Sequence, residues 1–385
     1  MVGGVWPIQP QTGGNPNPDD VVGRDDVIVE MLGQLEGGNN LLIVDPRRTG
    51  KTSTLVRMCR EPGVGAEAVM LSYEGAASTN EVFDLTVKAL ARHAGLGTRF
   101  KKAVKHIVKV DASAGPVTVS AAFANRSRID LLVDVVDAVA AKLNADEHLI
   151  VVLDEVPLAV ANIAKSESPA AAEVLLQRLR ALRQKPNRLR WVLAGSIGFH
   201  HVLRLAETNA GVINDLQPVS LGPLDSDGAR FLVQCLLSGI GREATGEAVE
   251  RIVEDTGGFP FLIHHVAHLL NHGDGDVSAD EATDAWSQFL DRDKSRSMTP
   301  MVTRLEDWFK ESLPAARRIL DSLAKATAPM SLDDLAGLQD DHADREALLD
   351  VVALLVDDHY LVDQDQLLSW RYDVLRRIWV HRRRL

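Results

Sequence analysis

Apolar residues in the first part of the chain follow two patterns, helical periodicity and short continuous runs. From Asp25 to Leu35 they recur at helical spacing, and after Gly37-Gly38 the run Leu41 to Val44 is entirely apolar. The same patterns predict strands at Ala68 to Ser72, His148 to Val156 and Arg190 to Ser196, and helices at Thr79 to His93, Ser127 to Leu143 and Pro169 to Gln184. Strands that alternate with helices favour a mostly parallel sheet with right-handed crossovers, and so an α/β fold.

The strand pattern stops near Asp225, and helical periodicity continues alone. Helices are predicted at Asp227 to Leu237, Glu247 to Asp255, Phe261 to Asn271 and Ala279 to Leu290. A charged linker, Asp291 to Thr299, comes next. It is followed by predicted helices at Ala315 to Ala326, Leu332 to Leu338 and Asp344 to Leu355, strands at Tyr360 to Val362 and Leu367 to Trp370, and a last helix at Tyr372 to Arg384. Three helices and a hairpin resemble a winged helix.

These changes of pattern divide the chain into four parts. We expect an extended N-terminal arm at 1–20, an α/β core at 21–224, a small helical domain at 225–295 and a winged-helix domain at 300–385. The arm is rich in Gly, Pro and Asn, and we expect it either to be flexible or to lie on the first domain. Residues 100–123 break the alternation of the core, and we interpret them as an insertion with a strand or hairpin that turns at Gly115-Pro116.

The segment Asp45 to Ser53, D-P-R-R-T-G-K-T-S, lies between a predicted strand and a predicted helix. A strand, a tight turn, Gly-Lys-Thr and a helix form the context of a phosphate-binding P-loop. Lys51 is expected to reach the β- and γ-phosphates, and the Thr52 hydroxyl to hold Mg²⁺. The residues expected around the phosphates are Pro46, Arg47, Arg48, Thr49, Gly50, Lys51, Thr52 and Ser53.

This motif departs from the usual P-loop pattern at its first position, where Asp45 replaces a glycine. Aspartate tolerates unusual backbone angles better than most residues, so the turn is compatible with it. Its carboxylate would be unfavourable beside phosphates unless it points away. Taken alone, the motif also leaves open a chance Gly-Lys-Thr at a helix start.

A second motif ends the apolar run His148 to Val156. Asp154 and Glu155 stand where a strand buried on both faces would end. Asp154 suits a direct or outer contact with Mg²⁺, and Glu155 suits activation of an attacking water, because that step needs a carboxylate. The alternative is an ordinary strand end with two solvated acids. The P-loop upstream favours the catalytic interpretation.

Composition limits the class of protein. The 385 residues are 45% apolar and 25% charged, with a net charge of −12, which argues against a protein built chiefly to coat nucleic acid. Cys59 and Cys235 are expected to be buried small hydrophobes in a reducing cytoplasm. The N-terminus lacks the basic start and apolar core of a signal peptide, and no apolar run approaches the length of a membrane span. We therefore expect a cytoplasmic protein with no membrane segment.

Two basic clusters leave nucleic-acid binding open without favouring it. Four lysines lie in the insertion, and a solvated helix face is the preferred interpretation: Lys101, Lys102, Lys105 and Lys109. The last helix is arginine-rich, whereas the region that should supply a DNA-reading helix is acidic, with Asp340, Asp341, Asp344, Glu346 and Asp350. Phosphate repulsion would oppose the usual docking. We therefore expect the arginines to pair within the protein or with a protein partner.

The order of these motifs resembles that of the prokaryotic AAA+/STAND ATPases, in the branch related to archaeal origin-recognition initiators. The resemblance is carried by V-V-G-R-D-D from Val21, P-R-R-T-G-K-T-S, L-I-V-V-L-D-E, W-V-L-A-G-S, T-G-G-F-P from Thr256 and the C-terminal winged helix. It implies a P-loop NTPase core on a parallel sheet, a helical lid and a winged helix. It also implies ATP or ADP with Mg²⁺ as cofactors.

The resemblance also implies roles for single positions. Val22, Gly23 and Arg24 would lie beside the adenine, Ser196 would occupy the sensor position near the γ-phosphate, and Pro260 would belong to the lid helix that packs near the nucleotide. His264 and His265 stand at the start of that helix, where relatives often carry an arginine, and packing is the preferred interpretation. Arg204 is the best candidate for an arginine finger, although a surface arginine is favoured there.

The leading hypothesis is an ATP-binding and hydrolysing molecular switch that couples nucleotide state to a protein partner. Its residues would be Lys51, Thr52, Asp154, Glu155 and Ser196, and assembly into an oligomer in the ATP state is left open. One alternative is a DNA-binding AAA+ ATPase of the initiator or transposition-helper type. Another is a non-hydrolysing scaffold that holds ADP.

Overall fold

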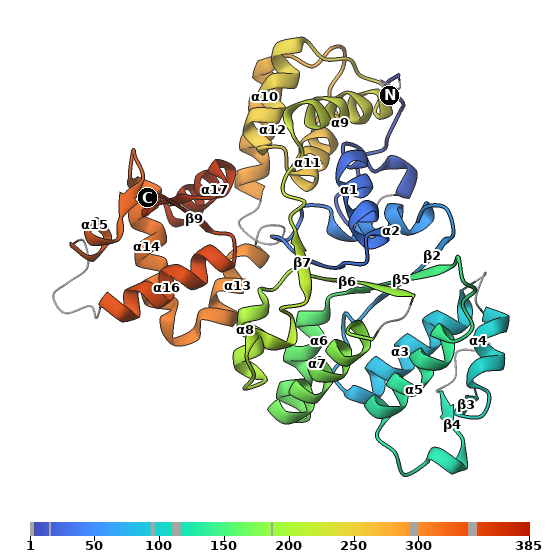
Figure 1. Cartoon of the computed structure of the whole chain (residues 1–385). Helices are drawn as coiled ribbons and strands as arrows, with labels where there is room; N and C mark the ends of the chain where they lie inside the picture. Colours follow the sequence, from blue (N-terminus) through green and yellow to red (C-terminus); the bar gives the residue numbers. More distant parts are fainter. Residues whose placement is uncertain are drawn as a thin grey trace.

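The computed structural model describes residues 4–14, 17–93, 97–109, 117–185, 188–292, 299–337 and 345–385. Its centre is a five-stranded parallel sheet in the order β2-β5-β6-β1-β7 (Figure 1). The strands are β1 (Asn40–Val44), β2 (Ala66–Ser72), β5 (His148–Asp154), β6 (Leu189–Gly195) and β7 (Leu216–Val219). The predicted α/β core is confirmed, and β7 is an additional edge strand that the sequence patterns did not single out.

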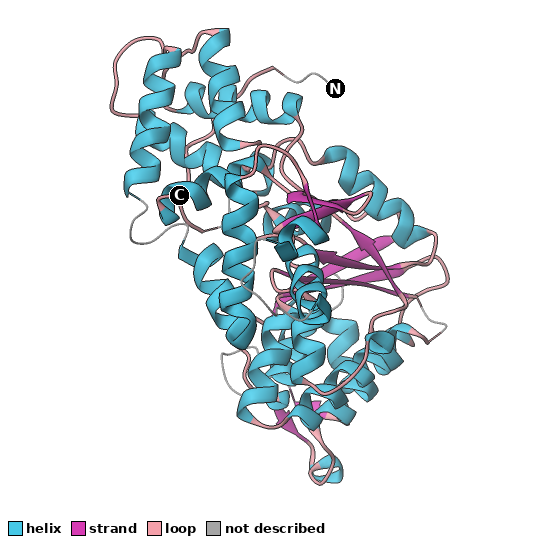
Figure 2. Ribbon diagram, turned by 90° about the vertical axis from the view of Figure 1, so that its left-hand side faces the viewer, coloured by secondary structure: helices cyan, strands magenta, loops and turns pink. Residues whose placement is uncertain are grey.

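Helices cover both faces of this sheet (Figure 2). They are α1 (Asp25–Glu36), α2 (Lys51–Arg60), α3 (Thr79–Arg92), α5 (Arg128–Ala140), α6 (Val156–Ser166), α7 (Pro169–Arg183) and α8 (Phe199–Leu205). Along β5, Leu149, Val151 and Leu153 face the cluster packed by α3, α5, α6 and α7. Ile150 and Val152 face the opposite cluster, which contains α1 and α2. A strand with an apolar layer on each face needs apolar residues at every position, which explains its continuous run.

The insertion is a small unit packed on the core. It consists of α4 (Gly97–Val104) and an antiparallel pair, β3 (Val108–Lys109) with β4 (Thr118–Val119). Phe100 and Ile107 anchor it in the apolar cluster of α3 and α5. The hairpin is confirmed, whereas its predicted turn at Gly115-Pro116 lies outside the described residues. The four lysines are exposed, as a solvated face requires.

The helical domain and the C-terminal region follow the core. The first contains α9 (Ser226–Gly239), α10 (Gly246–Thr256), α11 (Pro260–Leu270) and α12 (Ala279–Arg292). The second contains α13 (Thr299–Phe309), α14 (Leu313–Lys325), β8 (Met330–Ser331), α15 (Leu332–Gly337), α16 (Arg345–Asp357), β9 (Leu361–Gln364), β10 (Leu367–Trp370) and α17 (Asp373–Arg383). Its three strands form an antiparallel sheet in the order β8-β10-β9. The two regions share one apolar cluster, and Phe259 meets Tyr372 edge-to-face at 5.2 Å between ring centroids.

Helix α13 was not predicted, because its sequence follows a charged stretch and carries Pro300. Proline is compatible with the first turn of a helix, where its missing N–H has no partner to lose. Much of the linker predicted at Asp291 to Thr299, and the acidic residues Asp340, Asp341 and Asp344, lie outside the described residues.

The first part of the N-terminal arm lies on the helical domain, and its end, at Asp19, pairs with Arg60 of the core. The Ile8 backbone N–H donates to the Cys235 carbonyl at 3.0 Å, and Trp6 packs edge-to-face on Phe231. Gly239 lets the arm approach, because a Cβ there would come within 1.8 Å of the Ile8 carbonyl oxygen. A short 3-10 helix, η1 (Pro18–Asp20), leads from the arm to the core. The arm therefore joins the helical domain to the core beside α2.

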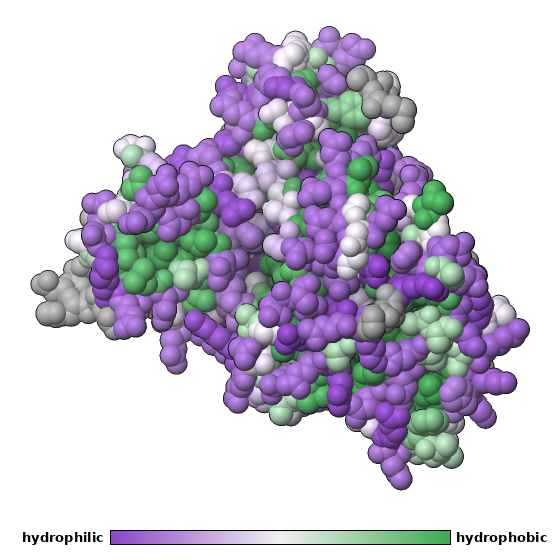
Figure 3. Space-filling view, in the orientation of Figure 1, coloured by the Kyte–Doolittle hydropathy of each residue, from purple (hydrophilic) through white to green (hydrophobic). Residues whose placement is uncertain are grey.

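Three arginines of α17 pair within the protein. Arg377 binds Asp255 of the helical domain, and Arg383 binds Asp321 on α14. Arg376 binds Asp373 on its own helix. Figure 3 shows polar side chains over most of the visible face and an apolar area over the C-terminal region. Within the described part of the chain, no helix combines the length and apolar character needed to cross a bilayer.

Candidate functional site

A cavity of about 320 Å³ lies where the sheet's carboxyl edge meets the helical domain. It is lined by Gln11, Gly14, Asp20, Val21, Val22, Arg24, Arg47, Arg48, Gly50, Lys51, Thr52, Ser53, Thr54, Glu74, Glu155, Ser196, Leu232, Pro260, Phe261 and His264. The carboxyl edge of a parallel sheet is the usual ligand-binding edge of open α/β folds. Most of the site residues predicted from the sequence are on this wall. The exceptions are Gly23, Pro46, Thr49 and Asp154, which lie behind it.

The loop from β1 to α2 turns the start of α2 toward the cavity. Gly50 caps that helix with φ of 88°, and Arg48 also has a positive φ of 74°. Glycine takes the left-handed conformation without steric cost, which is the reason for a glycine directly before Lys51. The free N–H groups of the first helical turn then face the cavity, and such a helix start favours anions.

Lys51 is folded back on its own loop. Its Nζ donates to the carbonyl oxygens of Asp45 at 2.7 Å and Pro46 at 2.8 Å, and only 6% of the residue is exposed. Burial lowers the pKa of Lys51 to about 8. The ammonium is therefore partly dehydrated and held by carbonyls that a stronger anionic partner can replace.

Asp45, the departure from the usual motif, points away from the cavity. Its carboxylate accepts from the Ser220 hydroxyl and from the Leu221 backbone N–H, each at 2.8 Å. The residue is 1% exposed. Asp45 thus ties the phosphate loop to the end of β7 and leaves the cavity free of its charge. An aspartate at this position is compatible with bound phosphates only if it points away from them, and the Asp45 side chain does so.

We expect Asp45→Ala to lower the free energy of unfolding by about 2–4 kcal/mol, because it removes the acceptor of two donors and strands the buried Leu221 N–H. Urea denaturation would measure the loss. Asp45→Asn keeps one acceptor oxygen and should lose less. Asp26→Ala, at an exposed acid on α1, serves as the control and should change little. Equal stability of Asp45→Ala and the control would contradict this role.

Thr52 and Asp154 form the second contact of the site. The Thr52 hydroxyl donates to Asp154 Oδ2 at 2.7 Å, and the other oxygen, Oδ1, accepts from the Glu155 backbone N–H at 2.9 Å. Asp154 is 2% exposed. A hydroxyl beside a carboxylate offers the hard oxygen ligands that Mg²⁺ prefers, so these residues fit that ion.

Glu155, Ser196 and Arg47 form a chain of polar contacts across the cavity. Ser196 donates to Glu155 Oε2 from its hydroxyl at 3.3 Å and from its backbone N–H at 3.4 Å. The Arg47 Nε donates to the Ser196 hydroxyl oxygen at 3.3 Å. Glu155 has a left-handed φ of 55° at the junction of β5 and α6, a conformation uncommon outside glycine. The strand end therefore presents this carboxylate to the cavity instead of continuing into the sheet.

The V-G-R segment lies at the other end of the cavity. Val22 and Arg24 line it, but the Arg24 guanidinium is committed to the protein, since it donates to the carbonyls of Leu221, Gly222 and Thr49. Gly23 takes a positive φ of 67°, and a Cβ there would come within 3.1 Å of the Gly228 backbone. Arg24 and Gly23 therefore brace the phosphate loop and the helical domain around the cavity.

Some of the residues that line the cavity were not predicted from the sequence, and others were expected to have a different role. The Gln11 backbone N–H donates to His264 Nδ1 at 3.1 Å, so the arm closes one side. Arg48 stacks on Phe261 with 4.2 Å from its guanidinium carbon to the ring centroid. Burial lowers the pKa of His264 to about 4, which keeps this imidazole neutral. The T-G-G-F-P motif marked the helix of Phe261 and His264, whereas no local signal marked the arm.

The C-terminal region contacts the back of the phosphate loop. His359 shares a 2.7 Å hydrogen bond with the carbonyl of Val44, the last residue of β1. Arg304 on α13 lies close enough for its charge to lower the pKa of Lys51, second to the effect of burial. Arg204, the candidate finger, is exposed on α8 and does not line the cavity. No sequence pattern pointed to Arg304 or His359.

Comparison with known proteins identifies the fold. No family model and no curated protein sequence matches the chain. Its structure is similar to the Walker-type ATPase of Pyrococcus abyssi, with a TM-score of 0.69 and 17% identity over 96% of this chain and 99% of that one. It is also similar to the ADP form of the ORC2 protein of Aeropyrum pernix, with a TM-score of 0.51 and 14% identity over 96% and 95% of the two chains. At these identities the likeness concerns the fold, and this chain shares with both proteins a fold that here consists of a parallel α/β core, a helical region and a small C-terminal antiparallel sheet.

Proposed function

We propose that this protein binds ATP in the cavity between its core and helical domain, hydrolyses it, and couples nucleotide state to a protein partner. One observation carries the proposal: the loop of Gly50, Lys51 and Thr52 lines the same cavity as Glu155 and Ser196. Groups that can bind phosphates beside a carboxylate are what phosphoryl transfer to water requires.

Binding rests on the start of α2. The backbone N–H groups of that turn and the Lys51 ammonium would hold the phosphates, after Lys51 leaves the carbonyls of Asp45 and Pro46. Thr52 and Asp154 would hold Mg²⁺, which neutralises charge on the phosphates. Arg48, stacked on Phe261, and the neutral His264 would enclose the remainder of the nucleotide.

Hydrolysis rests on Glu155. Its carboxylate would orient the attacking water and accept its proton. The hydrogen bond from the Ser196 hydroxyl would fix the position of that carboxylate. Arg47, which also contacts Ser196, would place a positive charge near the γ-phosphoryl group as it is transferred to water. The three residues come from the ends of β5, β6 and β1, so the sheet fixes their spacing.

Coupling rests on two contacts of the phosphate loop with other regions. Pro260 and Phe261 at the start of α11 line the cavity, so a bound nucleotide would draw the helical domain toward the core. His359 contacts β1 directly before Asp45, whose carbonyl binds Lys51. An exchange of Lys51 partners at the loop would therefore change the support of the C-terminal region. Nucleotide-dependent release of that region to a partner is the switch that we propose.

ATP affinity is expected to fall about tenfold between about pH 7 and pH 9. The free Lys51 ammonium loses its proton as the pH rises through about 8, whereas bound phosphates favour the charged form. Binding above that pH must therefore take up a proton, and each unit costs up to a factor of ten. Titration calorimetry in buffers of different ionisation enthalpy would measure both effects. Lys51→Arg, which stays charged, should have a flatter profile. A flat profile in the unmodified protein would contradict this role of Lys51.

The direct test of the proposed function is the nucleotide content and turnover of the purified protein. Bound ligand would be extracted and identified, and phosphate release from ATP would be followed with Mg²⁺ and with excess chelator. Release that depends on Mg²⁺ supports an ATPase. Tightly held ADP without any turnover would overturn the hydrolytic part and favour the ADP-bound scaffold. Absence of nucleotide together with no ATP binding would overturn the proposal as a whole.

A further inference from the structure

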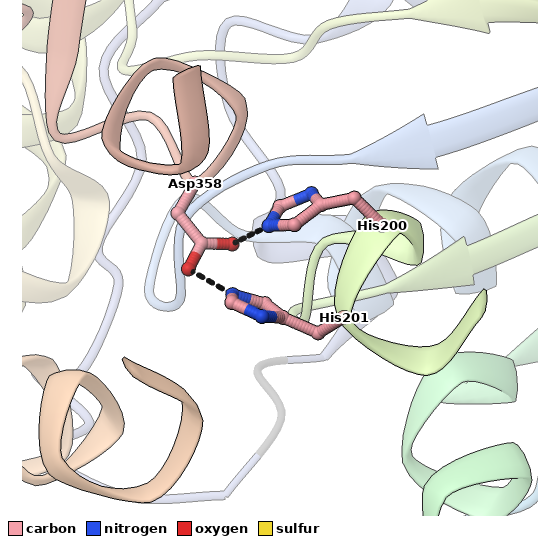
Figure 4. Close-up of side chains that lie close together, drawn as sticks. All are labelled: His200, His201 and Asp358. Atoms are coloured by element: carbon pink, nitrogen blue, oxygen red, sulfur yellow. Dashed lines mark hydrogen bonds and ion pairs between the residues drawn. The ribbon is translucent and has the colours of Figure 1, made fainter. Parts of the chain in front are cut away.

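A cluster of two histidines and one aspartate, none of which lines the nucleotide cavity, joins the core to the C-terminal region (Figure 4). His200 and His201 lie on α8, which follows β6 and Ser196. Asp358 lies directly after α16, at the turn toward β9. The three come together although Asp358 is 157 residues from His201. One donor atom from each residue lies within 4.8 Å of the others.

The contacts inside the cluster are incomplete. His201 Nε2 lies 2.7 Å from Asp358 Oδ2, a hydrogen bond. His200 Nε2 points at the other oxygen, Asp358 Oδ1, at 3.6 Å. Both of those atoms are buried and have no hydrogen-bond partner among the described residues. The Asp358 side chain is 1% exposed, so Oδ1 has lost its hydrogen bonds to water and accepts none from the described residues in their place.

A hydrogen-bonded His-Asp pair explains His201 but not His200. Gly198 makes room for the second ring: a Cβ there would lie 2.2 Å from His200 Cε1 and 2.7 Å from Asp358 Oδ1. The absence of a side chain at Gly198 therefore lets both imidazoles face the Asp358 carboxylate. The rings of His200 and His201 are 4.0 Å apart between centroids. An unfilled acceptor beside two converging nitrogens is the arrangement expected when a cation completes the group.

The surroundings suit a ligand set of two imidazoles and one carboxylate. Trp308 and Phe309 pack against His201 and exclude water on that side. Asp357 Oδ2 lies 3.8 Å from His200 Nδ1. Arg304 is the opposing cation, since its charge acts on Asp358.

We propose that His200, His201 and Asp358 bind a zinc ion that fastens the C-terminal region to the core. Imidazole nitrogen and carboxylate oxygen are ligands of Zn²⁺, with bonds of about 2.0–2.2 Å. Tetrahedral ligands at that distance are about 3.3 Å apart. His200 Nε2 lies 3.6 Å from Asp358 Oδ1, near this value. His201 Nε2 lies 2.7 Å from the other oxygen, Oδ2, and this hydrogen bond must open for both nitrogens to bind one ion.

Asp357 would act as the outer support of this site. A zinc-bound histidine usually donates its other ring N–H to a carboxylate, which fixes its orientation. His200 bound through Nε2 leaves Nδ1 toward Asp357, the contact that the structure already holds at 3.8 Å. Three protein ligands leave a fourth position for water. The inference does not rest on nucleotide binding or hydrolysis, because none of these residues lines the nucleotide cavity. A bound zinc would oppose the proposed release of the C-terminal region.

The test uses the whole chain without a histidine tag, purified without chelator. The protein would be stripped with chelator, saturated with Zn²⁺, desalted, and analysed for metal by mass spectrometry. Co²⁺ would be bound in parallel and its visible absorption recorded, which reports the ligand geometry. We expect about one zinc per chain, and a large loss of zinc in His200→Ala and in Asp358→Asn. Asp357→Asn should weaken zinc binding by about 10–100-fold.

Two controls keep the test decisive. His272→Ala removes an exposed histidine outside the cluster and should retain full zinc content. Circular dichroism and gel filtration would show which variants are folded, and the metal content of the unmodified protein does not depend on any variant. Chelator should lower the Tm of the unmodified protein and leave that of folded Asp358→Asn unchanged. Less than one zinc per ten chains, or equal zinc in folded His200→Ala, would overturn the proposal.

Discussion

Lys51→Ala is expected to weaken ATP binding by about 10²–10⁴-fold. The ammonium would make charge-assisted hydrogen bonds to two phosphates, each worth about 1.5–3 kcal/mol. At 1.4 kcal/mol per factor of ten, their loss gives this range. The buried position increases the effect, because the surrounding protein screens the charge less than water does. Titration with a fluorescent ATP analogue, or calorimetry, would measure the change.

The fold should survive this substitution. Among the described residues, Lys51 donates to two carbonyl oxygens of its own loop, and carbonyls at a cavity wall can bind water instead. Lys142→Ala, at an exposed lysine after α5, is the matched control and should bind ATP normally. Unchanged affinity in folded Lys51→Ala would show that the loop at Asp45 to Ser53 does not hold phosphates. The proposed function would then lose its basis.

Glu155→Gln is expected to retain ATP binding within a few-fold and to lower turnover by about 10²–10⁴-fold. Glutamine has the same shape, and its carbonyl oxygen can still accept from Ser196, so the cavity wall is preserved. It cannot accept the proton of the attacking water, because its amide is not basic. Phosphate release under single-turnover conditions, beside a binding titration, would separate the two effects.

A second carboxylate of the cavity provides the control. Glu74 also lines the wall but is exposed and lies beyond β2. Glu74→Gln should leave turnover close to that of the unmodified protein. Turnover that persists in Glu155→Gln, or falls equally in both variants, would mean that Glu155 is not the activating carboxylate. Loss of ATP binding in Glu155→Gln would show instead that this residue supports the cavity.

Local patterns along the chain were enough for the elements of the core and for the position of its phosphate loop. The runs at β1, β5 and β6 predicted buried strands, because a central parallel strand has an apolar layer on each face and admits few polar side chains. The Gly50-Lys51-Thr52 motif predicted a helix start after a strand, because glycine is needed where the backbone turns left-handed. These features depend on neighbours within a few residues, and the sequence displays such neighbours directly.

Local patterns were insufficient where a partner comes from a distant segment. They did not reveal which way the Asp45 carboxylate points, since the groups that donate hydrogen bonds to it, on Ser220 and Leu221, lie 175 and 176 residues further along the chain. The packing of the arm on α9 could not be predicted either, because an extended segment without periodicity does not indicate which element it packs against. Helix α13 was not predicted because a charged segment precedes it and Pro300 lies near its start, so that its stability depends on tertiary packing.

The sequence by itself determined an α/β core with a phosphate loop, a helical domain and a small C-terminal sheet, because periodicity and turn chemistry are local. Only the tertiary structure decided how these parts meet. It placed Glu155 beside Ser196, His264 against the arm, His359 behind the phosphate loop and Asp358 between two histidines. These contacts arise from the packing of strands and domains far apart in the chain. The energy of each depends on burial, which no single segment can specify alone.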